Sequence, residues 1–218
     1  MSIKSTFYPN QIEAAKKIFK KFSEGESNYD MLSAQMQSGK TGVSLYLAFE
    51  MLTSKIVKKV YIISGNSEKQ LKEQWEEKIR SHVDDYIAHN PEVAKDYDPK
   101  NKGLLSLFFG EKIEVIWRQD LMKNYERFCS DYLIIWDESH FATTEEQTLH
   151  KFFNETKLME SIQGNTTYMK DNKIFISSVT ATRCAEQSRQ VHHQTSFTQT
   201  IMTPQESYRG MEYFKEQG

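Results

Sequence analysis

The chain has 218 residues, of which 38% are hydrophobic and 27% charged, and a formal net charge of -2. This composition is typical of a globular protein with one large domain or two small ones, and the charge excludes a globally basic surface although a local basic groove remains open. Cys129 and Cys184 have no metal-binding or redox spacing, and no apolar run is long enough for a membrane span or a signal peptide. We therefore expect a cytoplasmic compartment and no membrane partner.

Helical and strand patterns alternate along the chain. Apolar residues at helical spacing, with capping signals, predict helices over residues 11–22, 41–52, 68–83, 120–128 and 144–154, and another starting at Asn90-Pro91. Short apolar runs predict strands over residues 30–34, 60–63, 113–117, 132–136 and 174–179. This alternation predicts a mostly parallel sheet with helices on both faces.

The segment between the first predicted strand and the second predicted helix carries the most specific motif. Its sequence AQMQSGKT, over residues 34–41, fits the phosphate-binding P-loop pattern A/G-x-x-x-x-G-K-S/T. Backbone N–H groups there form an anion nest at a helix N-terminus, Lys40 reaches the β- and γ-phosphates, and the Thr41 hydroxyl ligates Mg²⁺. We therefore expect ATP and Mg²⁺ as cofactors, with nucleotide contacts from Gln37, Ser38, Gly39, Lys40, Thr41 and Gly42.

An acidic pair, Asp137-Glu138, directly follows the strand predicted over 132–136. The carboxyl ends of parallel strands share one edge of the sheet, so this pair is expected to face the same crevice as the P-loop. We assign Asp137 to Mg²⁺, together with Thr41, and Glu138 to the attacking water. The predicted catalytic residues are Lys40, Asp137 and Glu138.

Asp137-Glu138-Ser139-His140 resembles the DExH box of helicases and translocases of the second helicase superfamily. Further stretches resemble family motifs in the required order: Tyr8-Pro9-Asn10-Gln11 the Q-motif, Ser64-Gly65-Asn66 motif Ia, and Thr180-Ala181-Thr182 motif III. The resemblance spans residues 8–182 and implies an α/β, three-layer RecA-like P-loop NTPase domain with a mostly parallel central sheet. The combination MQSGKTG with DESH also resembles helicase-like proteins of phages and large viruses.

The resemblance implies roles for several residues. Gln11 would read adenine, while Tyr8 would stack on it or, as an equal alternative, pack on the first helix. His140, Thr180 and Thr182 would couple the ATP site to movement, and Gly65 and Asn66 would contact the nucleic-acid backbone. Arg118, at the end of a predicted strand, is a further candidate phosphate contact.

The resemblance also implies a function for the chain. Residues 1–183 would form the first motor domain of an ATP-dependent helicase or translocase, and the polar segment 184–218 would be an exit or linker toward a second RecA-like domain that this sequence lacks. We expect slow ATP hydrolysis by the isolated domain, and a nucleic-acid track with DNA favoured over RNA. Two alternatives remain: an ATP-gated protein-interaction module, and a duplex translocase subunit of a restriction or remodelling complex that does not unwind. The compartment would be the host cytoplasm if the protein is viral.

Overall fold

The computed structural model describes residues 7–34, 39–64, 69–96, 108–137, 146–162, 165–180 and 198–203. Its six strands are β1 (Tyr29–Ser33), β2 (Lys59–Ser64), β3 (Ile113–Trp117), β4 (Tyr132–Trp136), β5 (Ile174–Thr180) and β6 (Thr198–Ile201). They form one sheet in the order β3-β2-β4-β5-β1-β6, and every pairing is parallel. The predicted parallel α/β architecture is confirmed.

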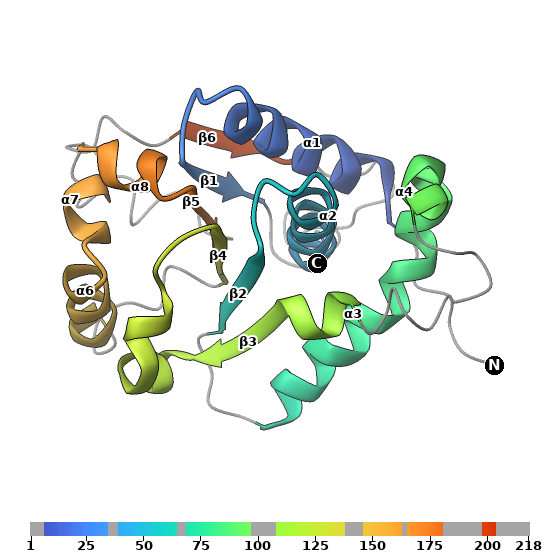
Figure 1. Ribbon diagram of the computed structural model, residues 1–218. Coiled ribbons are helices and arrows are strands. Elements are labelled where there is room, and N and C mark those ends of the chain that lie inside the picture. The colour runs from blue at the N-terminus through green and yellow to red at the C-terminus, as the bar shows by residue number, and fades with distance from the viewer. Residues whose placement is uncertain are drawn as a thin grey trace, which may run out of the picture.

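Helices cover both faces of this sheet, as Figure 1 shows. One layer contains α1 (Pro9–Ser23), α2 (Lys40–Thr53), α3 (Lys69–His89) and α4 (Pro91–Asp96). The other contains the 3₁₀ helix η2 (Arg118–Arg127), α6 (Glu146–Glu155), α7 (Leu158–Ile162) and α8 (Thr167–Asp171). In the part of the chain that the structure describes, no helix is long and apolar enough to cross a membrane.

The strands are apolar on both faces because each face meets a layer of helices. Along β2, Val60 and Ile62 join the core beneath α1 to α4, whereas Tyr61 and Ile63 join the core beneath η2 and α6 to α8. This alternation follows from the two-residue period of a strand, and it explains why the buried strands read as continuous apolar runs.

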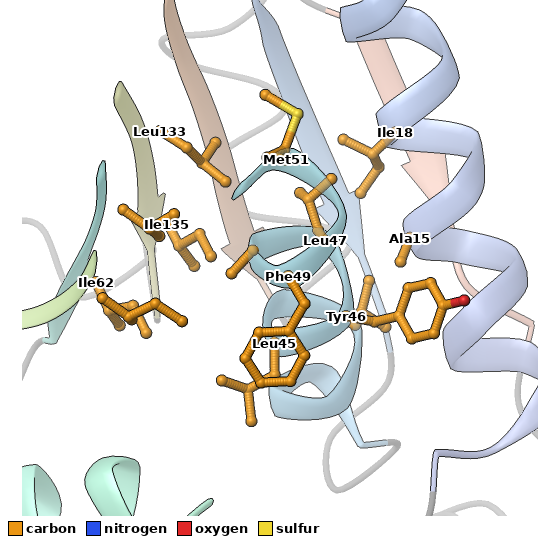
Figure 2. Close-up of a cluster of buried hydrophobic side chains, with 14 of the residues drawn as sticks. Ala15, Ile18, Leu45, Tyr46, Leu47, Phe49, Met51, Ile62, Leu133 and Ile135 are labelled. Atoms are coloured by element: carbon orange, nitrogen blue, oxygen red, sulfur yellow. The ribbon is translucent and has the colours of Figure 1, made fainter. Parts of the chain in front are cut away.

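Helix α2 is the centre of the first core. Almost every side chain from Gly42 to Leu52 is buried, as expected of a helix that is hydrophobic all round. Figure 2 shows the helix between Ala15 and Ile18 of α1 on one side and Leu133 and Ile135 of the sheet on the other. The helix that follows the P-loop is therefore held rigidly, and so is its N-terminus.

Two local predictions differ from the structure. The segment predicted as an α-helix over 120–128 is a 3₁₀ helix, because Met122, Tyr125 and Phe128 recur every three residues and all pack on the second core. The polar segment 184–218 was predicted to be an exit outside the folded domain, but Thr198–Ile201 forms the edge strand β6. Its sequence lacks an apolar run because Thr200 is the one buried residue of this strand.

Candidate nucleotide-binding and motor site

The strand order brings the two strongest sequence motifs to one edge of the sheet. The P-loop follows β1 and Asp137 follows β4, and only β5 lies between these two strands. The register places Thr180 beside Ser33 at the end of β1, and Ser178 beside Trp136 at the end of β4. The two motifs are thus separated by two strand spacings, roughly 10 Å, which a nucleotide triphosphate with its metal ion can bridge.

The described part of the P-loop is its C-terminal half. Gly39 has φ 88° and ψ 29°, the left-handed conformation, and stands at the N-cap of α2. A residue with a Cβ is strained there, which explains the glycine. The amide of Gly42 donates to the carbonyl of Gly39 at 2.9 Å, closing the first turn, in which Lys40 and Thr41 are half-buried. Gln37 and Ser38 lie outside the described residues.

The arrangement fits a phosphate group. The first turn of an α-helix presents N–H groups without intrahelical partners, and its dipole favours an anion. Lys40 supplies a cation in the same turn. The predicted phosphate-binding role of this turn stays a prediction that the helix geometry supports.

Gln11, the predicted adenine reader, packs directly on the P-loop turn. Its side chain is 4% exposed, its Nε2 donates to the carbonyl of Gly39 at 2.9 Å, and its Oε1 accepts from the amide of Tyr8 at 3.0 Å. A Cβ on Gly42 would lie 2.5 Å from Oε1, and one on Gly39 would clash with Nε2. Both glycines therefore leave space for the Gln11 amide, a role that the sequence motif did not reveal.

Tyr8 is the N-cap residue of α1 and is 53% exposed. Its backbone is fixed by the hydrogen bond to Gln11, and its exposed ring is available to a planar base. The neighbouring Phe7 is 2% exposed and packs against Tyr46 and Phe49 of α2. Stacking of Tyr8 on the base and its packing on the first helix both stay predictions, and the exposure of the ring favours stacking. Asn10 was assigned no separate role from its motif, and its Nδ2 donates to the carbonyl of Thr203 at 2.9 Å, just beyond β6.

Asp137 is half-buried directly after β4, and its amide donates to the carbonyl of Ile63 at 3.0 Å. This bond extends the β2–β4 pairing by one residue, and it fixes the position of the Asp137 backbone from which the carboxylate projects. Among the described residues, no three His, Cys, Asp or Glu side chains gather as a metal site. One carboxylate and one hydroxyl, completed by phosphate oxygens and water, is the donor set that suits Mg²⁺ in nucleotide sites. Glu138 and His140 lie outside the described residues.

The remaining predicted site residues follow neighbouring strands at the same edge. Thr180 is the last residue of β5, between the P-loop strand and the Asp137 strand. Arg118 directly follows β3, where it begins η2. Gly65 and Asn66, which follow β2, and Thr182, which follows β5, lie outside the described residues.

Comparisons with known proteins agree with this architecture. The family model described as "Type III restriction enzyme, res subunit" matches residues 4–182. The DEAD-box helicase Mss116, in a structure with ssRNA and UDP-BeF, aligns at a TM-score of 0.56 with 15% identity over 91% of this chain and 41% of that chain. The yeast DEAD-box splicing factor Prp28 aligns at a TM-score of 0.46 with 12% identity, over 84% of this chain and 44% of that one.

At this level of identity the match to Mss116 shows a shared fold, which confirms the predicted RecA-like architecture. The chain spans less than half the length of either helicase. No curated protein matches the chain.

Proposed function

Since the chain belongs to the family described as type III restriction enzyme, res subunit, we propose that it is the first motor domain of an ATP-dependent nucleic-acid helicase or translocase. The family match confirms the predicted resemblance to helicases of the second superfamily, and ATP hydrolysis of the helicase type is part of the proposal. The observation that carries the proposal is the placement of the P-loop turn and Asp137 on either side of β5 at one edge of the sheet.

The proposed chemistry is hydrolysis of the γ-phosphate of ATP. Lys40 and the backbone amides of the P-loop, including those of Gln37 and Ser38, hold the phosphates, and Thr41 and Asp137 hold Mg²⁺. The metal ion, when bound, neutralises charge on the phosphate oxygens. Glu138 orients and polarises the attacking water.

Recognition of the base is assigned to the start of α1. The amide of Gln11 carries both donors and acceptors, the combination needed to recognise the edge of adenine. In this structure one N–H of Nε2 is bound to the carbonyl of Gly39 and one lone pair of Oε1 to the amide of Tyr8. The second N–H and the second lone pair of the amide are the groups proposed to meet the base. The exposed ring of Tyr8 supplies a stacking surface.

Coupling to movement is assigned to the ends of the strands between the nucleotide and the track. Thr180 stands between the two halves of the ATP site, which suits a residue that transmits nucleotide state; His140 and Thr182 share this proposed role. Strands β2 and β3 lie on the far side of β4 from β1. Gly65 and Asn66, which follow β2 in the sequence, and Arg118, which follows β3, are proposed to contact the nucleic-acid backbone.

A second RecA-like domain is the proposed partner in the intact motor, because it would supply the rest of the ATP site and of the track. We place DNA ahead of RNA as the track and the cytoplasm as the compartment, that of a host cell if the protein is viral. The family description, which names a restriction enzyme, favours translocation along a duplex as the second candidate function.

The test is steady-state ATP hydrolysis by the chain joined to its second motor domain, with and without single-stranded DNA, duplex DNA and RNA. Lys40→Ala serves as the blank, and Glu138→Gln should bind ATP but hydrolyse it slowly. Stimulation by one polymer would identify the track. Turnover indifferent to every polymer would refute the motor and leave the ATP-gated interaction module, and normal turnover by Lys40→Ala would refute the P-loop assignment.

A further inference from the structure

A chain of hydrogen bonds connects α3 to the base-reading end of α1. The amide of Phe7 donates to Oδ2 of Asp85 in α3 at 2.5 Å. The next amide, that of Tyr8, donates to Oε1 of Gln11 at 3.0 Å, and Nε2 of Gln11 donates to the carbonyl of Gly39 at 2.9 Å. Each member fixes the orientation of the next, from a carboxylate on α3 to the P-loop turn.

The side chain of Phe7 is held in place as well as its amide. The ring of Phe7 is 2% exposed and meets the rings of Tyr46 and Phe49 edge-on, with centroid distances of 5.2 and 6.4 Å. The imidazole of His82, one turn before Asp85 on α3, lies 4.8 Å from the same ring. With both its amide and its ring held, Phe7 has little freedom to rotate, so the direction of the following Tyr8 amide is set.

We propose that Asp85 is a positioning residue for adenine recognition. By holding the amide of Phe7 it aims the amide of Tyr8 at Oε1 of Gln11, and so decides which edge of the Gln11 side chain is offered to the base. A charged acceptor suits this task, because hydrogen bonds to ionised groups are shorter and stronger than neutral ones. The inference rests on the proposed function, in which Gln11 reads adenine, and adds a residue 78 positions from Phe7, whose amide it holds.

The test compares Asp85→Ala with Asp84→Ala by titrating each folded variant with ADP and with GDP in a calorimeter. Asp84 is the matched control, since it is the same residue type one position earlier on α3 and is exposed. We expect Asp85→Ala to weaken ADP binding on the order of tenfold, the scale of one lost hydrogen bond, while GDP binding changes little. Asp84→Ala should leave both affinities unchanged.

A double variant distinguishes a positioning role of Asp85 from a general loss of stability. In a Gln11→Ala variant the base contact is already gone, so adding Asp85→Ala should not change the ADP-to-GDP affinity ratio further. Asp85→Asn keeps the shape and one acceptor oxygen, and serves if Asp85→Ala does not fold; we expect a smaller loss of selectivity in the same direction.

The contrary outcomes are distinct. A wild-type ratio in folded Asp85→Ala, or in Asp85→Asn if the alanine variant fails to fold, would overturn the positioning role while leaving the proposed function intact. A wild-type chain that does not prefer ADP over GDP would remove adenine recognition from the proposed function, and the role of Asp85 would fall with it.

Discussion

Replacement of Lys21 by methionine should be among the most destabilising single changes outside the apolar core. Its ammonium lies 2.7 Å from Oδ1 of Asp30, whose side chain is fully buried, while the Lys21 side chain is 18% exposed. Lys21 also donates to the carbonyl of Gln199 and to the hydroxyl of Thr200, both at 2.9 Å. Lys21 in α1 therefore holds the edge strand β6 as well as neutralising a charge on β1.

The magnitude follows from what Lys21→Met leaves behind. Methionine keeps the apolar stem of the side chain but removes the cation, so the carboxylate of Asp30 stays buried without its counter-charge. The hydroxyl of Thr198 still donates to Oδ1 of Asp30 at 2.6 Å. Its Oδ2 already has no hydrogen-bond partner among the described residues. Breaking a buried ion pair in this way costs about 3–5 kcal/mol of unfolding free energy. In a domain of this size that lowers Tm by about 6–20 °C.

The assay is urea and thermal unfolding followed by circular dichroism. Lys20→Met is the control, because that side chain is 71% exposed and its nearest carboxylate, on Glu24, is 3.9 Å away; it should change stability by no more than about 0.5 kcal/mol. Adding Asp30→Asn to Lys21→Met should recover part of the loss, since the uncompensated charge is gone. A cost below about 1 kcal/mol for Lys21→Met would refute the argument that this pair is held away from water.

Three further predictions concern the site and the core. Gly42→Ala should raise KM for ATP with a smaller effect on kcat, because the new Cβ would lie within 2.5–2.8 Å of the Gln11 amide; an unchanged KM would mean that the amide moves without consequence. Burial lowers the pKa of His82 below 6.5, so the neutral form stabilises the fold above pH 6.5 and that contribution is lost as pH falls below it. Urea midpoints at pH 7.5 and 5.5 should therefore converge in His82→Gln, and an equal pH dependence in wild type and variant would contradict this. Phe49→Ala should lower the free energy of unfolding in urea by about 3–5 kcal/mol, since the ring is fully buried and contacts Phe109 at a centroid distance of 4.3 Å. A loss under about 1 kcal/mol would contradict this and show that neighbouring side chains fill the cavity.

Much of the architecture could be predicted because its signals are local. The apolar runs of β2 and β4 are continuous since both of their faces are buried, and the P-loop and DESH motifs lie within a few residues of the strands that carry them. The position of Asp137 relative to Lys40 followed from the rule that parallel strands end at the same edge. These features depend on short stretches of sequence and on chain order.

What could not be predicted depends on contacts between distant residues. Strand β6 is polar, and it joins the sheet by pairing with β1. Lys21 also binds Gln199 and Thr200 of this strand from more than 170 positions away. The Gln11 amide fits beside Gly39 and Gly42 because both lack a Cβ atom, and neither is near it in sequence. The amide of Phe7 is likewise held by Asp85, which is 78 positions away. A sequence motif identifies the residue at such a site, but the hydrogen-bond partners of that residue are known only from the folded structure.

The place of β1 in the sheet has a consequence for how the protein is made. Both neighbours of this strand in the described sheet, β5 and β6, come late in the chain, and Asp30 meets Thr198 across 168 residues. During synthesis the strand that precedes the P-loop cannot complete its sheet pairing until β5 and β6 have left the ribosome. The edge of the sheet at which the P-loop and Asp137 meet is therefore completed late in folding, after β5 has been made.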